Sequence, residues 1–209
     1  MGGAGTENPT DGTNLIPNAE RGTWIGNRMF IPYKTSTERD LVAISDYLNA
    51  TRYAGIRAQG RINQGSSDKL VAIVKFGKSE TALCFKEASL YALNNILDDL
   101  ALMTLDEVTT EYGLAGPNAV ANIGKEAVDL TDEVWFLASK KGICRAGYDR
   151  DGRLGVASVP ITDEVQKVID RINWNYASEA AFAVWDNKFY AALPIDTAVL
   201  DSLNVVPAG

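Results

Sequence analysis

The stretch from Lys69 to Asn94 reads KLVAIVKFGKSETALCFKEASLYALN, and its pattern is the one that the rest of the chain repeats. It contains three short apolar runs: Leu70–Val74, Thr81–Phe85 and Leu90–Leu93. Polar turns separate these runs, at Phe76–Ser79 and at Lys86–Glu87. Short apolar runs joined by tight polar turns predict consecutive antiparallel β-strands.

The same pattern recurs along the chain as a polar turn, then a charged residue, then a strand rich in aromatic residues. The charged residues are spaced by 52, 53 and 55 positions (28 to 80, 80 to 133 and 133 to 188): Arg28, Glu80, Glu133 and Lys188. Recurrence at roughly 40–50 residues is typical of propeller blades, each a four-stranded antiparallel sheet. We therefore predict an all-β protein, a β-propeller-like array of about four antiparallel sheets.

The rest of the chain is assigned in the same way. Strands are expected at 24–31, 40–46, 106–112, 119–123, 134–138, 143–146, 180–185 and 188–193. Residues 49–67 are expected to be a polar connection, and 125–131 an acidic insert. The first and last copies of the repeat are expected to be incomplete, because little apolar sequence precedes Trp24 or follows Leu193.

One short helix is predicted near 163–172. Thr162 can cap its free amides, and the acidic residues that follow suit the positive end of a helix. One face of the helix carries an apolar stripe that we expect to pack against the protein: Val165, Val168, Ile169 and Ile172. Leu90, Leu93, Leu97 and Leu100 also have helical spacing. We favour a strand up to Asn94, with an irregular or helical insert within 95–103.

Residues 1–18, MGGAGTENPTDGTNLIPN, are rich in Gly, Thr, Asn and Pro. Such a segment buries too little apolar surface to offset its chain entropy. We predict a flexible N-terminal arm over 1–18, which is a tag remnant or a segment that orders on a partner. Residues 19–209 are predicted to form the propeller domain.

Composition excludes several kinds of function. The net charge of −7 argues against binding to nucleic acid, and the absence of histidine removes imidazole-based catalysis and metal sites. The two cysteines, Cys84 and Cys144, form no CxxC motif. No apolar run approaches the length of a membrane span. No catalytic, cofactor-binding or metal-ligating residues stand out, and no cofactor is expected.

Carboxylates leave one enzymatic alternative open, because some propellers are glycoside hydrolases that use paired carboxylates. Six residues could be recruited: Asp46, Asp98, Asp99, Asp106, Glu107 and Asp170. No spacing singles out a pair among them, so this is the weakest of the alternatives. Asp149–Gly152 resembles the start of a calcium loop, but the remaining ligand positions do not follow, and we interpret it as an ordinary turn.

A glycan- or protein-binding module is the other alternative, because loops at one end of a propeller often bind ligands. Glycan binding favours exposed aromatic side chains. The four tryptophans lie in or beside expected strands, and we expect them to pack in the core: Trp24, Trp135, Trp174 and Trp185. For Trp174 a contact with a neighbouring subunit is an alternative to covering its own helix.

The order of the motifs resembles a β-propeller family of bacteriophage tail proteins, the tail nozzle (tail tubular) proteins of short-tailed phages. The motifs extend over about 21–196 and are Trp24–Phe30, Glu107–Gly113, Glu133–Ala138, Lys141–Ile143, Pro160–Val165, Ile169–Trp174 and Asn187–Pro194. Family members are usually much longer than this chain, so the resemblance implies a fragment, a minimal version or one segment of a composite propeller.

The resemblance implies a virion structural protein that forms a nozzle- or adaptor-like conduit in the tail and has no catalytic activity. Its implied partners are other virion tail proteins and further copies of itself in a homo-oligomeric ring. It implies no sequence-specific binding of nucleic acid and no membrane span. The implied location is the virion tail, after assembly in the host cytoplasm.

Overall fold

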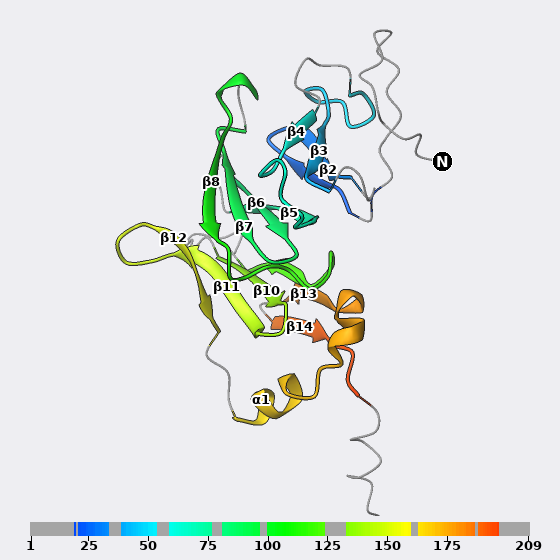
Figure 1. The fold of residues 1–209 in the computed structure, drawn as a ribbon, viewed down its shortest axis with the longest axis vertical. Helices are drawn as coiled ribbons and strands as arrows, with labels where there is room; N and C mark the ends of the chain where they lie inside the picture. The colour runs from blue at the N-terminus through cyan, green and yellow to red at the C-terminus, as the bar shows by residue number, and fades with distance from the viewer. Residues whose placement is uncertain are drawn as a thin grey trace, which may run out of the picture.

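A computed structural model describes residues 19, 21–33, 39–53, 59–76, 81–96, 100–123, 133–159, 163–186 and 188–196. Within these residues the protein is mostly β, with four antiparallel sheets that follow one another in chain order. The colours of Figure 1 make this order visible, from the blue strands β2 and β3 to the orange strand β14. The all-β prediction is therefore confirmed. The predicted arm at 1–18 lies outside the described residues.

Three of the sheets have four strands, each paired with the next along the chain. The first sheet comprises β1 (Thr23–Ile25), β2 (Arg28–Pro32), β3 (Leu41–Ile44) and β4 (Gln59–Arg61). The second comprises β5 (Leu70–Phe76), β6 (Thr81–Lys86), β7 (Leu90–Asn94) and β8 (Thr104–Thr109). The third comprises β9 (Val120–Asn122), β10 (Glu133–Ala138), β11 (Gly142–Tyr148) and β12 (Leu154–Ser158). The fourth sheet has two strands, β13 (Ala181–Trp185) and β14 (Lys188–Ala192).

The described helices are short. The α-helix α1 spans Asp163–Ile169, within the predicted range, and 3₁₀ turns span Leu100–Leu102 and Trp174–Glu179. The first 3₁₀ turn lies inside the predicted insert, whereas the second was not predicted. No helix in the described part of the chain is long and apolar enough to cross a membrane.

Strands β5, β6 and β7 of the second sheet are buried on both faces, and this explains their continuous apolar runs. Ile73, Cys84 and Tyr91 lie on the face toward the first sheet, in a cluster with Phe30 and Ile44. The opposite face packs on the third sheet, in a cluster with these members: Ala72, Val74, Leu83, Phe85, Ala92, Val134, Phe136, Cys144 and Ala146. At its centre the rings of Phe85 and Phe136 are 4.8 Å apart.

The first strands of successive sheets contact one another: β1 contacts β5, β5 contacts β9, and β9 contacts β13. Side chains connect them as well, because the Thr23 hydroxyl donates to the Ile73 carbonyl (2.5 Å) and the Asn122 amide to the Lys75 carbonyl (3.1 Å). Sheets therefore stack face to face with their first strands adjacent. The described strands do not form a closed sheet.

The structure corrects the expected number of strands. The first copy of the repeat is not incomplete, because residues 49–67, predicted to be a connection, contain the three-residue strand β4. The third sheet has an additional strand, β12, after the Asp149–Gly152 turn. Both missed strands are edge strands and contain Gly, so their apolar pattern is weak. The last copy has two described strands, β13 and β14, and residues 197–209, where a further strand would have to lie, are outside the described residues.

Two further predictions fail. The apolar stripe of α1 is only half packed, since Ile169 and Ile172 are buried but Val165 and Val168 are exposed. A helix that touches the protein along one narrow line leaves the neighbouring positions in water. Lys86, predicted to lie in a charged turn, is the last residue of β6 and is completely buried. The acidic insert at 125–131 and the capping residue Thr162 lie outside the described residues.

Candidate interaction surface

One face of the fourth sheet has no other described sheet against it and is exposed to solvent. In β13 and β14 successive side chains point to opposite faces, and directly paired residues share a face. The pairs Ala181 with Ala192, Ala183 with Tyr190, and Trp185 with Lys188 therefore lie together. We call these six residues the outer face: Ala181, Ala183, Trp185, Lys188, Tyr190 and Ala192.

The outer face is exposed and mainly apolar. Trp185 is 76% exposed and Tyr190 is 49% exposed, and the three alanines are also exposed. Lys188 is the one charged residue in the set. Isolated exposed apolar residues are ordinary, but a contiguous patch with aromatic members is typical of a binding surface.

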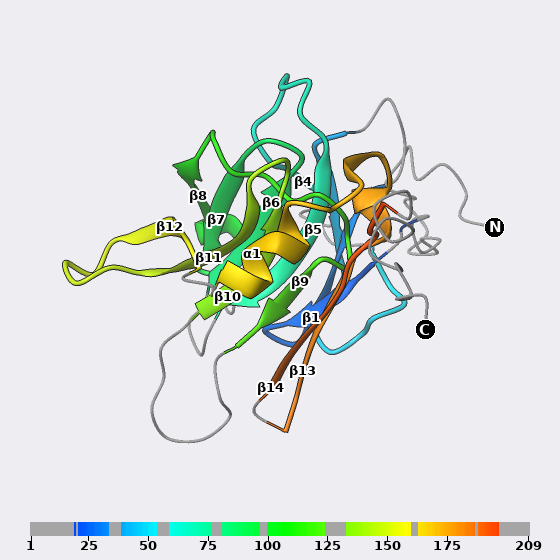
Figure 2. The ribbon, with the colours of Figure 1, turned by 90° about the horizontal axis from the view of Figure 1, so that it is seen from below.

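The opposite, inner face holds the fourth sheet to the rest of the protein. The ring of Phe189 lies between those of Trp135 and Phe182, with centroid distances of 5.0 and 4.9 Å. The amide of Phe182 also donates to the carbonyl of Asn118 (2.9 Å). These contacts fix the direction in which the outer face points. Figure 2 shows the β13–β14 hairpin at the margin of the molecule, and β13 lies against β9.

One edge of this sheet is also without a described partner. Among the described strands, β14 pairs with β13 alone. An unpaired edge presents backbone N–H and C=O groups that can pair with another chain. The last sheet therefore combines an apolar face with an open edge.

The tryptophans divide into two groups. Trp135 and Trp174 are partly buried and pack against the large core cluster, as predicted, and Trp174 shares that cluster with Ile169 and Ile172 of its own segment. Trp24 and Trp185 are exposed, so the prediction that they pack in the core is wrong. Trp24 is 43% exposed on β1 and Trp185 lies next to the β13–β14 turn.

The candidate catalytic carboxylates each have an ordinary polar partner. Asp46 pairs with Arg52 (3.1 Å), and Asp170 accepts from the Gln166 amide (2.7 Å). Asp106 and Glu107 are neighbours on β8, where Asp106 accepts from Asn94 (2.8 Å) and Glu107 from the Tyr91 hydroxyl (3.4 Å). Successive residues of a strand point to opposite faces, so these two carboxylates do not face one another. Asp98 and Asp99 lie outside the described residues.

The Asp149–Gly152 segment is a turn between β11 and β12. Its Asp149 carboxylate accepts from the backbone amides of Asp151 and Arg153, at 2.9 and 2.8 Å. No group of three metal-ligating side chains occurs in the described part of the chain. Both cysteines are free and buried, and burial raises the pKa of the Cys84 thiol to about 12.

Comparison with known proteins adds no relative: no family model matches the chain, and no curated protein is significantly similar to it.

Proposed function

We propose that the protein is a structural component of a bacteriophage tail, a β-propeller-like module without catalytic activity. It contributes sheets to a nozzle- or adaptor-like conduit, and its partners are further copies of the chain in a ring and other tail proteins. Support comes from the order of the motifs, from the four sheets in chain order, and from the adjacent first strands of successive sheets.

The observation that carries this proposal is the outer face of β13–β14. Within the chain, the first, second and third sheets each have the next sheet against one face, whereas the fourth has an exposed face of Ala, Trp and Tyr side chains. A sheet from the next subunit covers this face as the internal sheets cover one another. Trp185 and Tyr190 then become buried anchors, a role that Trp and Tyr often have in interfaces.

The alanines suit such a contact. Ala181, Ala183 and Ala192 leave the backbone of the sheet accessible, so a second sheet can approach while the two aromatic rings occupy gaps in its surface. A contact between two different surfaces is heterologous, and repeated heterologous contacts generate rings when the rotation closes. This is the geometry that a tail conduit requires.

Two observations test the proposed function. Negative-stain microscopy of the purified protein is expected to reveal rings or arcs of several subunits. Sequencing of the genes on either side is expected to identify portal, capsid or other tail genes. Single small particles at all concentrations, together with neighbouring genes unrelated to virions, would contradict the proposal.

A glycan-binding module is the second candidate, and the exposure of Trp24 and Trp185 favours it. Exposed aromatic rings can stack on sugar rings. Binding to immobilised polysaccharides that is lost in Trp185→Ala, with no change in particle mass, supports this candidate. A change in particle mass without polysaccharide binding supports the structural role.

A further inference from the structure

One edge of β14 carries backbone groups that point away from β13. The amide of Phe182 in β13 donates to the carbonyl of Asn118 (2.9 Å), and therefore not to β14. In an antiparallel sheet such a residue belongs to a pair whose backbone groups point apart. Its partner Ala191 thus directs its own N–H and C=O away from β13. Phe189 lies two residues earlier on the same strand and points the same way, because backbone groups alternate along a strand.

This edge continues beyond the end of β14. The carbonyl of Pro194 accepts from the amide of Asn173 (2.9 Å), and the amide of Asp196 donates to the carbonyl of Arg171 (3.2 Å). Ile195 lies between these two residues in a bridge of the antiparallel type, so its N–H and C=O point to the opposite side. The connection after α1 thus lies on the same side of the extended chain as β13, and the other side stays open.

Four alternate residues contribute their N–H and C=O groups to what we call the open edge: Phe189, Ala191, Leu193 and Ile195. Among the described residues, these groups on the open edge have no hydrogen-bond partner. Ala191 is exposed and the other three residues are half-buried, so a further strand can reach the edge. Each N–H and C=O that pairs there gains the hydrogen bond that neighbouring strands normally supply.

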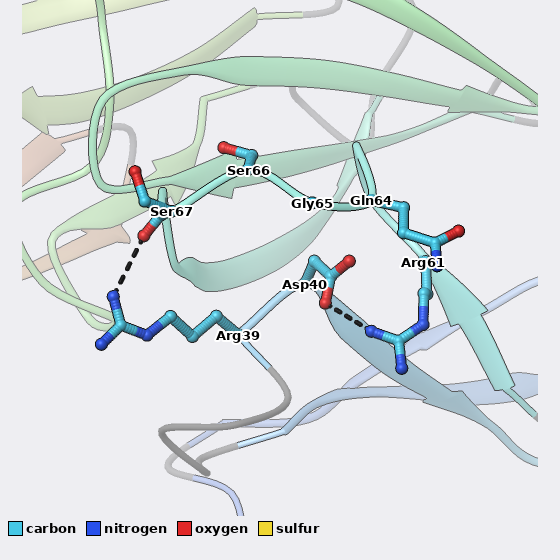
Figure 3. A pocket seen from close by; sticks show the side chains of 7 residues that line it. All are labelled: Arg39, Asp40, Arg61, Gln64, Gly65, Ser66 and Ser67. Atoms are coloured by element: carbon cyan, nitrogen blue, oxygen red, sulfur yellow. Dashed lines mark hydrogen bonds and ion pairs between the residues drawn. The ribbon is translucent and has the colours of Figure 1, made fainter.

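The open edge differs in this respect from the polar hollow beside the first sheet, which Figure 3 shows. In the hollow, Arg61 pairs with Asp40 (2.7 Å), and Arg39 donates to the carbonyl of Ser67 (3.2 Å). Protein partners therefore already hold the charged groups of the hollow. The open edge is the better prepared of the two for a new partner.

The next part of the sequence has the pattern of a strand that fits this edge. Residues 200–206 read LDSLNVV, and apolar and polar residues alternate from Ser202 to Val205. Such alternation is typical of a strand with one apolar face. Leu200 and Leu203 also have helical spacing, but a helix of this length is marginal on its own in water. The open edge favours the strand, because it offers a partner to every second residue.

We propose that residues 200–206 form a third strand of the fourth sheet, antiparallel to β14 of the same chain. A loop over 196–199 has a common hairpin length and brings Leu200 opposite Ile195. In this register Asn204 lies opposite Ala191, and every residue of the open edge meets one residue of the new strand. The short loop gives the segment a high effective concentration at its own edge, so pairing within the chain prevails over pairing with a second copy.

The third strand enlarges the outer face. Directly paired residues share a face, so Leu203 lies beside Ala192, and Val205 lies beside Tyr190. Two apolar side chains thereby join the surface that the proposed function uses for assembly. The pairing itself rests on the open edge and does not depend on that function.

A cysteine pair tests the register. Ala192 and Leu203 form a pair whose Cα atoms should be about 4.5 Å apart, a separation that a disulfide can bridge. With oxidised glutathione, Ala192→Cys/Leu203→Cys is expected to form a disulfide within one chain, detected by mass spectrometry as the loss of two hydrogen atoms. Ala192→Cys/Asn204→Cys is the matched control and should stay reduced, because its second thiol lies on the opposite face. Both native cysteines are buried.

Three results of this experiment would overturn the proposal. Equal cross-linking of the two variants would mean that the segment has no fixed register. Absence of the bond in both would place the segment elsewhere. A disulfide between two chains, seen as a dimer on a denaturing gel without reductant, would mean that the strand comes from a second copy.

Hydrogen exchange provides a readout that needs no new cysteine. The amides of Phe189, Ala191 and Leu193 are expected to exchange at least about tenfold more slowly in the wild type than in Asn204→Pro, which lacks an N–H that meets the open edge. Leu203→Pro loses an N–H that points away from β14 and should keep the protection. Fast exchange of these amides in the wild type would refute the pairing. Exchange does not report particle mass, so this test and that of the proposed tail function can fail independently.

Discussion

The indole ring of Trp135 in the third sheet meets the phenyl ring of Phe189 in the fourth sheet edge to face, with centroids 5.0 Å apart. Phe182 extends this group on the neighbouring strand, at 4.9 Å from Phe189. The fourth sheet has two described strands, so these rings provide much of its attachment to the core. The same attachment leaves the opposite face of the sheet directed away from the core.

The two faces of β13 are expected to respond differently to substitution. Phe182→Ala removes a buried ring and should lower the free energy of unfolding by about 3 kcal/mol or more. Trp185→Ala, on the exposed face of the same strand, should change it by less than about 0.5 kcal/mol in dilute protein. Urea unfolding measures both. A larger loss for Trp185→Ala would mean that the outer face is packed within the subunit.

A glycine pair tests the junction of the second and third sheets. A Cβ atom at Gly113 would overlap the backbone of Glu87, whereas one at Gly155 would meet nothing within 4 Å. We expect Gly113→Ala to lower the melting temperature strongly, because the backbone of one segment must move, and Gly155→Ala to leave it nearly unchanged. Differential scanning calorimetry compares the two. Similar melting temperatures would show that the two segments do not approach so closely.

Helix α1 offers a test of its partial packing. Ile169 is 5% exposed and lies against Gly142, whereas Val168 is 38% exposed. Ile169→Asp buries an unpaired carboxylate and should destabilise the protein by several kcal/mol. Val168→Asp places its charge in water and should be tolerated. If both substitutions have the same effect in urea unfolding, the helix is packed differently.

We expect burial of the Cys84 thiol to make the free energy of unfolding depend on pH in the alkaline range. Its thiol pKa rises from 9.0 to about 12 on folding, because burial disfavours the thiolate. Below pH 9 the protonated thiol makes its full contribution to the free energy of unfolding. This contribution is lost as the pH rises from 9 toward 12, by roughly 1.4 kcal/mol per pH unit. Between pH 8.5 and 10.5 the wild type should therefore lose more stability than Cys84→Ala. If urea unfolding shows that the wild type and Cys84→Ala lose the same amount of stability over this pH range, the result would contradict the burial of this thiol.

Much of the fold could be predicted because the repeat is regular. Arg28, Glu133 and Lys188 each begin the second strand of a sheet, and Glu80 immediately precedes the second strand of another. The spacing of these residues therefore follows the sheets. Strands β5–β7 were predicted nearly residue by residue, because a sheet buried on both faces has continuous apolar runs.

Other features depend on tertiary contacts that no local pattern records. The edge strand β4 reads Gln-Gly-Arg and has no apolar period. In the sequence, Lys86 has the pattern of a turn residue. In the folded protein it is buried, because the loop that carries Ile62 and Asp68 covers it. The tryptophans Trp135 and Trp185 both lie in strands of aromatic and apolar residues, and only the presence or absence of a covering sheet distinguishes them.

Assembly through the outer face is the central claim, and light scattering coupled to size-exclusion chromatography tests it most directly. The wild type is expected to give a mass several times that of the 22.6 kDa chain, falling on dilution. Trp185→Glu places a charge on the outer face and should give the monomer mass. Tyr176→Glu, at another exposed aromatic residue, should assemble as the wild type does. A wild type that is monomeric at every concentration, or a Trp185→Glu variant that assembles fully, would contradict the account.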